Sequence, residues 1–271
     1  MKFIENERHI IYNCINRKLE RRKFMYKNYI FDLYGTLIDI NTNEWSISLW
    51  KKMVEFYGFY EAFYTPKELK EAFYEQCRLK EEKLQKKTGY DYPEIELQKV
   101  FKKLFKMKGI KVDMQTCEVA CKFFRIMSTK YIKLYDGVLE FLDDLKKNGK
   151  NIYLLSNAQQ IFTEDEMRLV GIYDKFDGIV FSSDERCRKP SADFYNIILE
   201  RYNLKKEESI MIGNDPTTDI LGAHNVGLAS LYIHSNISPQ NVNKDEVLAD
   251  YIIMDGNFKK ISKMILKKTK K

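Results

Sequence analysis

The spacing of apolar residues changes along the chain, and each spacing predicts a different kind of element. The short apolar run Tyr29–Phe31 predicts a buried strand, and Asp32 stands at the carboxyl end of that strand. From about residue 42 to residue 132, apolar residues recur three and four positions apart, as they do in helices with one buried face. We predict four helices there, over residues 42–57, 66–87, 93–108 and 113–130.

The apolar stripes of these four helices are expected to form a core rather than a cofactor site. The first stripe is Trp45, Leu49, Met53 and Phe56. The stripe of the third helix is Val100, Leu104 and Met107, and that of the fourth is Cys117, Ala120, Cys121, Phe124 and Met127. Thr65, Pro66 and Glu68 have the spacing of a helix start with a capping box.

After Asp136, predicted strands and helices alternate. The strands are expected at 151–155, 178–181, 209–212, 228–233 and 251–254, and the helices at 138–148, 158–171, 191–202 and 217–226. Such alternation favours right-handed crossovers and a parallel sheet covered on both faces. We therefore predict an α/β fold, with a Rossmann-like core that is interrupted after its first strand by a helical insertion.

The predicted organisation has three parts. Residues 1–24 mix charged and apolar residues and are expected to be a peripheral N-terminal extension. Residues 25–40 and 134–271 are assigned to the Rossmann-like core, and residues 41–133 to the helical insertion.

Composition indicates an ordinary globular protein. Hydrophobic residues make up 44% of the chain and aromatic residues 14%, which is enough to bury a large core. No apolar run approaches the roughly 18 to 20 residues of a membrane span, and Glu5, Glu7 and Arg8 make the start a poor signal peptide. We expect a cytoplasmic protein without a membrane partner. The five cysteines form no CxxC pair, so neither a disulfide framework nor a zinc site is indicated.

The net charge of +7 is confined to the two ends of the chain. Residues 1–28 carry a net charge of +5 and residues 257–271 carry +7, which leaves about −5 for the residues between them. Charge in terminal segments is usually solvated, so we expect no nucleic-acid partner.

Polar residues gather where the predicted strands end. In an open parallel sheet the carboxyl ends of the strands share one edge, where ligands bind. We therefore expect these side chains to meet at one site. The residues at or just after strand ends are Asp32, Gly35, Thr36, Ser156, Asn157, Asp215 and Asp219, and Lys189 lies in the loop that follows the strand at 178–181.

In their order and spacing, these motifs resemble those of the haloacid dehalogenase superfamily, a large group made up mostly of phosphate-ester hydrolases. The family's first motif, Asp-x-Asp-Gly-Thr, is similar to residues 32–36 except at position 34. Ser156 is similar to its second motif and Lys189 to its third. Its fourth motif, a Gly-Asp with a further Asp downstream, is similar to residues 213–219, where Asn214 takes the usual place of the first acid. The resemblance extends from about residue 29 to residue 256.

The chemistry of the acidic residues agrees with the roles that the resemblance implies. Asp32 would be the nucleophile that forms an aspartyl phosphate, although a turn-capping Asp is the alternative. With Asp215 and Asp219, it would bring three carboxylates into one small volume, and their mutual repulsion is costly unless a cation binds there. The candidate ligands are hard oxygen atoms with no His among them, and such a set points to Mg²⁺ as the cofactor. Asp219 has a second interpretation, as an acid stabilised by a helix dipole.

The resemblance also implies a ligand set for the metal and for the substrate. Mg²⁺ would be held by the Asp32 carboxylate, the backbone carbonyl of Tyr34 and the acid of the fourth motif. We assign that acid to Asp215 and give Asp219 a supporting role.

Lys189 would neutralise the phosphate and the nucleophile, while Ser156 would bind a phosphoryl oxygen. The predicted substrate-binding residues are Thr36, Ser156, Asn157 and Lys189. Each of the two residues has an alternative interpretation when it is considered alone. Lys189 could be a solvated lysine in a basic loop, and Ser156 could cap a turn after a strand.

Tyr34 is the departure from the family pattern. Phosphatases of the family have Asp there as the general acid and base, a contribution of roughly 10² to 10⁴ in rate. Tyrosine, with a pKa of about 10, is a poor substitute. The resemblance places Tyr at this position in dehalogenases, where halide leaves without a proton, but those enzymes have a shorter, neutralised fourth motif.

We therefore predict a Mg²⁺-dependent phosphatase of small phosphorylated metabolites. Its partner would be a small phosphate ester, and the chain would be a monomer or a homodimer. The alternatives are a 2-haloacid dehalogenase and a catalytically weak protein that binds phosphate or metal.

The insertion at residues 41–133 lies where the family places a mobile helical cap, which would close over the site and select the substrate. Asn41, Thr42, Asn43 and residues 59–64 are candidates for specificity because they lie near predicted hinges or loops. The alternative is that the aromatic residues among them only pack the cap.

Overall fold

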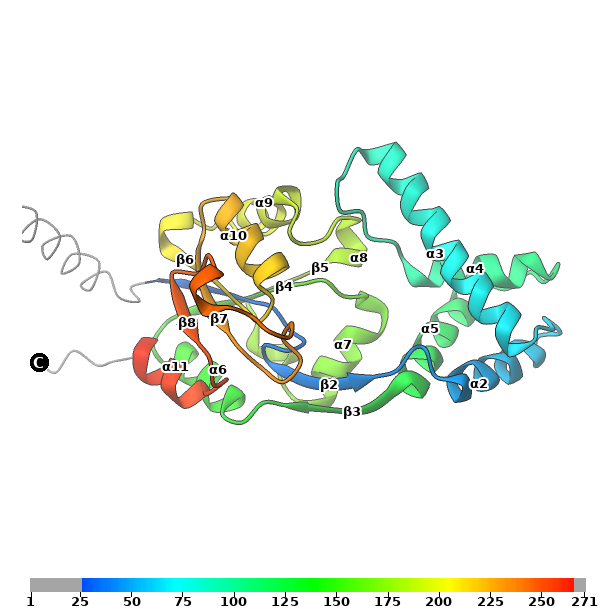
Figure 1. Ribbon diagram of the computed structural model, residues 1–271, viewed down its shortest axis with the longest axis horizontal. Helices are drawn as coiled ribbons and strands as arrows, with labels where there is room; N and C mark the ends of the chain where they lie inside the picture. Colours follow the sequence, from blue (N-terminus) through cyan, green and yellow to red (C-terminus); the bar gives the residue numbers. More distant parts are fainter. Residues whose placement is uncertain (1–25, 266–271) are drawn as a thin grey trace, which may run out of the picture.

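A six-stranded parallel sheet forms the centre of the molecule, with the strand order β5-β4-β1-β6-β7-β8 (Figure 1). The computed structural model describes residues 26–265. Strand β1 (Asn28–Phe31) lies between β4 (Asn151–Ser156) and β6 (Ser209–Gly213). The outer strands are β5 (Gly178–Phe181), β7 (Ala229–Ile233) and β8 (Tyr251–Ile253). The predicted α/β class with a parallel sheet is confirmed. The predicted extension at residues 1–24 lies outside the described residues.

The register of the central strands brings their carboxyl ends to one edge of the sheet. Phe31 pairs with Leu154 on one side and with Ile212 on the other. The backbone N–H of Asp32 also donates to the carbonyl of Ile212 at 2.9 Å, so the pairing continues past the end of β1. The polar residues that follow each strand are therefore neighbours, as the parallel arrangement predicts.

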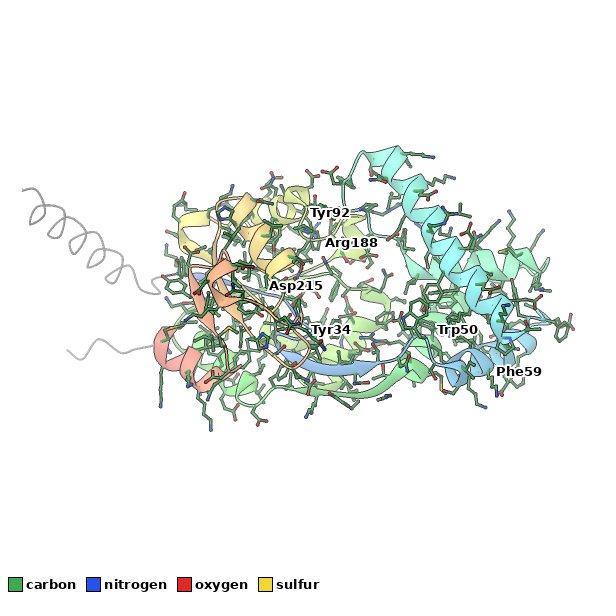
Figure 2. The ribbon with its side chains drawn as sticks, in the orientation of Figure 1. Tyr34, Trp50, Phe59, Tyr92, Arg188 and Asp215 are labelled. Atoms are coloured by element: carbon green, nitrogen blue, oxygen red, sulfur yellow. The ribbon has the colours of Figure 1, made fainter. Side chains whose placement is uncertain are left out.

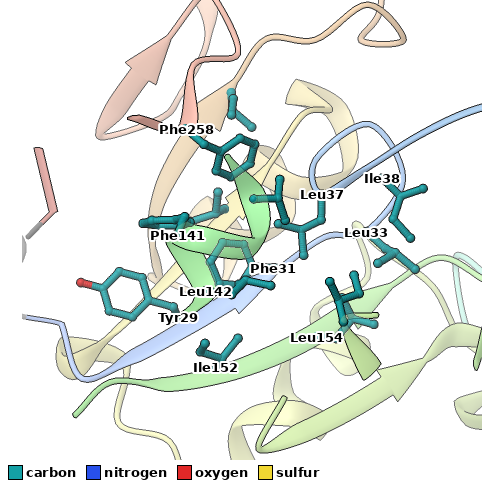
Figure 3. Packing of buried hydrophobic residues seen from close by; sticks show 14 of the residues in the cluster. Tyr29, Phe31, Leu33, Leu37, Ile38, Phe141, Leu142, Ile152, Leu154 and Phe258 are labelled. Atoms are coloured by element: carbon teal, nitrogen blue, oxygen red, sulfur yellow. The ribbon is translucent and has the colours of Figure 1, made fainter. Parts of the chain in front are cut away.

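Alternate residues of β1 face opposite layers of helices. Tyr29 and Phe31 pack in one hydrophobic cluster with Phe141 and Phe258, whereas Ile30 belongs to a cluster on the other face (Figure 3). The first face is covered by α6 (Val138–Lys147), α7 (Gln160–Leu169) and α11 (Phe258–Ile265). The second face is covered by α9 (Ala192–Arg201) and α10 (Leu221–Asn225). Helix α11 was not predicted, because its lysines dominate the composition of that stretch.

Four helices, α2 to α5, pack around a hydrophobic core of their own, to one side of the sheet (Figure 1). We call these four helices the cap. They are α2 (Ile47–Gly58), α3 (Pro66–Thr88), α4 (Leu97–Met107) and α5 (Met114–Ser128). The capping box that was predicted at Thr65 and Glu68 is present, with both of its hydrogen bonds formed.

A two-stranded antiparallel ribbon of β2 (Ile38–Thr42) and β3 (Thr129–Leu134) joins the cap to the sheet. The sequence analysis did not predict this ribbon, because its two short strands are separated by the whole cap and neither stands out from the helical pattern. Two predicted helices are shortened as a result. Helix α2 begins at Ile47, so Trp45 lies outside it, is 66% exposed and stacks on Tyr74.

Smaller differences lie at the ends of elements and in loops. The helix predicted at 217–226 is a π-helical turn, η3 (Pro216–Ile220), followed by α10. Met107 and Met127, which were assigned to buried stripes, are exposed at the last turns of their helices. A short helix, α8 (Ser182–Glu185), lies in a predicted loop, and 3₁₀ turns occur at η1 (Tyr173–Lys175), η2 (Lys206–Glu208) and η4 (Lys244–Glu246).

The four cysteines within residues 26–265 are free thiols. Within residues 26–265, no helix is both long and apolar enough to cross a membrane.

Candidate active site

Asp32 follows β1 directly and is nearly buried, with 7% of its surface exposed. The chain turns sharply after it, and Gly35 has a φ angle of +85°. A Cβ atom at Gly35 would lie 2.3 Å from Nδ2 of Asn214, closer than real Cβ contacts allow. Both the backbone angle and the space therefore require glycine, which allows the first and fourth motifs to pack together.

The Lys189 ammonium lies between two buried carboxylates. Its Nζ is 2.6 Å from Oδ1 of Asp32 and 2.6 Å from Oδ1 of Asp219. Burial acts to lower the pKa of Lys189, but the charges of Asp219 and Asp32 outweigh burial and raise it. Lys189 therefore stays protonated and holds the positive charge beside the Asp32 carboxylate.

The backbone of Lys189 is held by Asn157. The Asn157 amide donates to the carbonyl of Lys189 at 3.1 Å, and the N–H of Lys189 donates to Oδ1 of Asn157 at 2.8 Å. Both ends of the Asn157 side-chain amide are thus bound to the backbone of Lys189, which helps to hold the ammonium in place. The predicted role of Asn157 in binding substrate stays a prediction.

Both carboxylate oxygens of Asp219 accept hydrogen bonds. One carboxylate oxygen accepts from Lys189, and the other accepts from the backbone N–H of Asp215 at 3.0 Å. The hydroxyl of Tyr195 donates to the carbonyl of Asp219 at 2.7 Å. Burial raises the pKa of Asp219, with the charge of Lys189 acting against it and that of Asp32 adding to it. Asp219 is thus hydrogen-bonded to Lys189, and its predicted supporting role at a metal stays a prediction.

Asp215 is only partly buried and begins the π-helical turn η3. Its Oδ1 accepts from the backbone N–H and the hydroxyl of Thr217, both at 2.7 Å, and from the N–H of Thr218 at 3.3 Å. These contacts fix the orientation of the carboxylate. Turns of this kind are frequent at functional sites.

The two predicted hydroxyl donors differ in their surroundings. Thr36 Oγ1 lies 3.0 Å from Oδ2 of Asp32 and 3.3 Å from Oδ1 of Asn214. Its single hydrogen therefore stabilises the Asp32 carboxylate. Ser156 Oγ is buried and has no hydrogen-bond partner among the described residues. A buried hydroxyl without a partner is costly, and an oxygen of a bound phosphate would satisfy it.

The available oxygen ligands fit Mg²⁺ held by few protein groups. In residues 26–265, no three acidic, histidine or cysteine side chains gather closely enough to hold a metal, and Asp219 is hydrogen-bonded to Lys189. The Asp32 and Asp215 carboxylates and the Tyr34 carbonyl are the oxygen groups that could bind a metal here. Mg²⁺ commonly binds to one or two carboxylates and keeps several waters, so this donor set suits it.

The Tyr34 side chain is anchored to the cap and to α7. Its hydroxyl donates to Glu166, on α7, and lies 3.1 Å from Oγ1 of Thr163. Arg125, on α5 of the cap, makes two hydrogen bonds to the same Glu166 carboxylate and stacks 5.1 Å from the Tyr34 ring. Figure 2 shows Tyr34 between the sheet edge that bears Asp215 and the cap.

The burial of Tyr34 raises the pKa of its hydroxyl above the ordinary value for tyrosine. The charge of Arg125 acts in the opposite direction, and that of Glu166 adds to the effect of burial. The Tyr34 hydroxyl therefore keeps its proton, which it shares with Glu166 in a hydrogen bond. The sequence analysis missed Arg125 and Glu166, because each looks like an ordinary charged residue of an amphipathic helix.

The cap contacts the core a second time, through the segment between α3 and α4. The Arg188 guanidinium donates to the carbonyl of Pro93 and to Glu81, each at 2.9 Å. The Arg188 N–H also donates to the carbonyl of Tyr92 at 2.9 Å, and Figure 2 shows these two residues together. The loop that carries Lys189 is thus attached directly to the cap.

The residues that were predicted as candidates for substrate specificity lie in two different parts of the molecule. Asn41, Thr42 and Asn43 lie on or beside the ribbon and are exposed. Within residues 59–64, Phe59 is 89% exposed and lies at the end of the cap away from Asp215 (Figure 2). The Tyr64 hydroxyl donates to the carbonyl of Leu104. These aromatics belong to the cap's own packing and outer surface.

The fold and the site define a Rossmann-like α/β protein: a carboxylate and a buried hydroxyl lie at the strand ends of a parallel sheet, and an ammonium from a neighbouring loop contacts the carboxylate. The model of the haloacid dehalogenase-like hydrolase family matches residues 26–227. The chain belongs to this family.

Relatives and solved structures agree with this assignment. The chain is 33% identical over 107 residues to a glyceraldehyde 3-phosphate phosphatase of Methanothermobacter thermautotrophicus, a match that covers 40% of this chain and 47% of that protein. It thus spans about half the length of this relative. A pyrimidine 5′-nucleotidase of Streptococcus pneumoniae is 24% identical over 76% of this chain and 83% of that protein. The structure of a 2-haloacid dehalogenase from Pseudomonas syringae has the same fold, with a TM-score of 0.63, 18% identity, and coverage of 89% of this chain and 99% of that one.

Proposed function

We propose that the protein is a Mg²⁺-dependent phosphatase of small phosphorylated metabolites that acts through an aspartyl phosphate on Asp32. The observation that carries the proposal is the buried Lys189 ammonium between Asp32 and Asp219. At the same edge of the sheet, the Ser156 hydroxyl has no hydrogen-bond partner within residues 26–265. A positive charge and a free donor suit a phosphoryl group, whose charge they would neutralise. The relative named above as a glyceraldehyde 3-phosphate phosphatase supports the same kind of activity.

In this mechanism an Asp32 carboxylate oxygen attacks phosphorus, and the bond from phosphorus to the leaving oxygen breaks. Water then attacks the phosphorus of the acyl phosphate and releases inorganic phosphate and the free carboxylate. Thr36 and Lys189 hold the carboxylate, while Lys189 and Ser156 receive phosphoryl oxygens. Mg²⁺ bound by Asp32, Asp215 and the Tyr34 carbonyl would supply additional positive charge.

We further propose that residues 41–133 act as a cap that excludes water and selects the substrate. Two features support this role. The ribbon β2–β3 is a narrow connection between the cap and the sheet, and the Arg125–Glu166–Tyr34 contact joins the cap to the residue two positions after the nucleophile. The position of the cap is thereby linked to the nucleophile loop.

The metal requirement tests the proposal. We expect hydrolysis of p-nitrophenyl phosphate to stop when the protein is treated with EDTA and to return with Mg²⁺. Asp215→Asn keeps the oxygen that caps η3 but loses the charge, so the Mg²⁺ concentration for half-maximal activity should rise at least about tenfold. The thermal stabilisation by Mg²⁺ should fall in parallel. Full activity in EDTA would contradict the metal assignment.

The hydrogen bond between the Tyr34 hydroxyl and Glu166 predicts that the rate of hydrolysis depends strongly on the acidity of the leaving group. Because its hydroxyl is bound to Glu166, the leaving oxygen receives little help from a general acid. Phenyl phosphate should therefore react roughly 10²-fold more slowly than p-nitrophenyl phosphate, whose leaving group is more acidic. Tyr34→Phe should leave this ratio unchanged, and Tyr34→Asp should reduce it by supplying an acid. A ratio that rises in Tyr34→Phe would show that the hydroxyl does donate a proton.

A second candidate, 2-haloacid dehalogenation, is favoured by the same observation at Tyr34, because halide leaves without a proton. Here an Asp32 carboxylate oxygen would displace halide from carbon and form an ester that water cleaves. Halide release from 2-chloropropionate in the presence of EDTA, with no release by Asp32→Asn, would favour this candidate. Phosphate binding without turnover of any phosphate ester or haloacid would instead indicate a binding protein.

A further inference from the structure

The cap and the core share a cavity that is lined mainly by positive charges and lies apart from the residues of the candidate active site. Its volume is about 180 Å³. We propose that this cavity is a binding site for a small, multiply charged phosphate anion. The charged groups that line it are Lys80, Lys83, Lys87, Lys99, Arg186 and Glu96.

The cations converge because of helix geometry. Lys80, Lys83 and Lys87 are three and four residues apart on α3, so they lie on one face of that helix. Lys99 comes from the first turn of α4, and Arg186 follows α8 of the core. Three separate elements therefore direct positive charge at one space, which a solvated lysine stripe on a single helix would not do.

The cavity contains too little negative charge to neutralise them. Of the described residues, Glu96 is the one acid that lines it. Glu96 is shared between Lys99 and Arg186, whose Nη1 lies 3.8 Å away. Four positive charges are therefore left over. By contrast, Arg188, close by on the same core loop, is paired with Glu81 at 2.9 Å.

Two further features favour an anion. Arg186 Nε is buried and has no hydrogen-bond acceptor among the described residues. Burial lowers the pKa of Lys80, and the charges of Lys103, Lys99 and Lys83 lower it further. A bound anion would reduce the repulsion between these lysines and would accept a hydrogen bond from the Nε–H of Arg186.

The walls also suit a small ligand. Leu84 and Ile95 contribute buried apolar surface, and the volume exceeds that of several water molecules. Because the lysines come from the cap and Arg186 from the core, an anion here would bridge the two. Arg186 lies three residues before Lys189, so the bridge would strengthen the attachment that Arg188 already makes.

The site can be tested with pyrophosphate and inorganic phosphate in EDTA, using the Ile95 methyl resonance as a local reporter. In the wild type we expect a saturable shift of this resonance. Lys83→Gln/Lys87→Gln should weaken the affinity measured at Ile95 at least about tenfold, since two charged hydrogen-bond donors are lost. The matched control is Lys51→Gln/Lys106→Gln, which removes two exposed cap lysines outside the cavity and should change the affinity less than about twofold.

Either an unsaturable shift in the wild type or equal weakening in both double variants would overturn the proposal. The second result would mean that net charge alone attracts the anion. The Ile95 reporter does not depend on turnover, so a failure of the phosphatase proposal would leave this test intact. Hydrolysis of p-nitrophenyl phosphate should be the same in both double variants, since none of the four lysines lies among the active-site groups.

Discussion

Asp32→Asn is expected to lower kcat for p-nitrophenyl phosphate at least about 10³-fold, because the amide cannot form the acyl phosphate. The fold should survive the change. Lys189 keeps its 2.6 Å contact with Asp219, and Thr36 keeps an oxygen acceptor at position 32. Rapid quenching of the wild type with labelled substrate should trap label on Asp32, and the variant should carry none.

Asp177→Asn is the matched control for this substitution. Asp177 accepts from the backbone N–H of Ile152, near the amino end of β4, and so lies at the opposite edge of the same sheet. We expect its kcat to remain within about twofold of the wild type, as is usual for substitutions away from the chemistry. If Asp32→Asn keeps more than a tenth of the activity while Asp177→Asn is normal, Asp32 is not the nucleophile.

Lys189→Met is expected to damage both folding and activity. Removing the ammonium leaves two carboxylates facing each other without a cation, which should lower the free energy of unfolding by about 3–5 kcal/mol. Activity should fall by about 10² to 10³, the usual cost of removing one group that stabilises developing charge. Chemical denaturation in EDTA measures the first effect without compensation by a bound metal.

The loss of stability should depend on pH with a definite sign. Burial raises the pKa of Asp219 in the folded state, and Lys189 opposes that rise. Without Lys189, the folded protein binds protons more strongly than the unfolded chain, so the stability of the variant should fall as pH rises above the ordinary pKa of Asp. It should recover in mildly acidic solution. A cost that is independent of pH would point to lost packing rather than lost charge.

A second substitution separates stability from catalysis. Lys189→Met/Asp219→Asn removes one of the two facing carboxylates and should restore at least half of the lost stability, while activity stays low. Lys175→Met is the matched control, because Lys175 makes a partly exposed ion pair with Asp143 at 2.5 Å. Exposed pairs contribute little, so this variant should lose no more than about 1 kcal/mol.

Local patterns account for most of what could be predicted about the fold and the site. The apolar run before Asp32 and the alternation after Asp136 predict a parallel sheet, and such a sheet brings strand ends together whatever the details of packing. The nearness of Asp32 and Ser156, at the carboxyl ends of the paired strands β1 and β4, follows from that rule. The four cap helices were predictable for a similar reason, since their apolar period of three and four is a property of each segment alone.

Pairings between distant residues could not be read in the same way. The ribbon β2–β3 is formed by two short strands that are separated in the sequence by the whole cap. Neither strand has a sequence pattern that identifies the strand with which it pairs. Asn157 follows a strand like any ligand-binding residue, and its role in holding Lys189 depends on where the loop at 189 passes.

The sequence by itself determined the family of the protein, the strand-end residues of the candidate site and the unusual Tyr at position 34. The tertiary structure decided what that Tyr contacts: Glu166 lies 132 positions away, and Arg125 reaches it from the cap. It also decided that Asp219 supports Lys189, and that three lysines of α3 face Arg186. The physical reason is that periodicity and turn chemistry act over a few residues, whereas the charge and burial around a side chain depend on segments brought together only by folding.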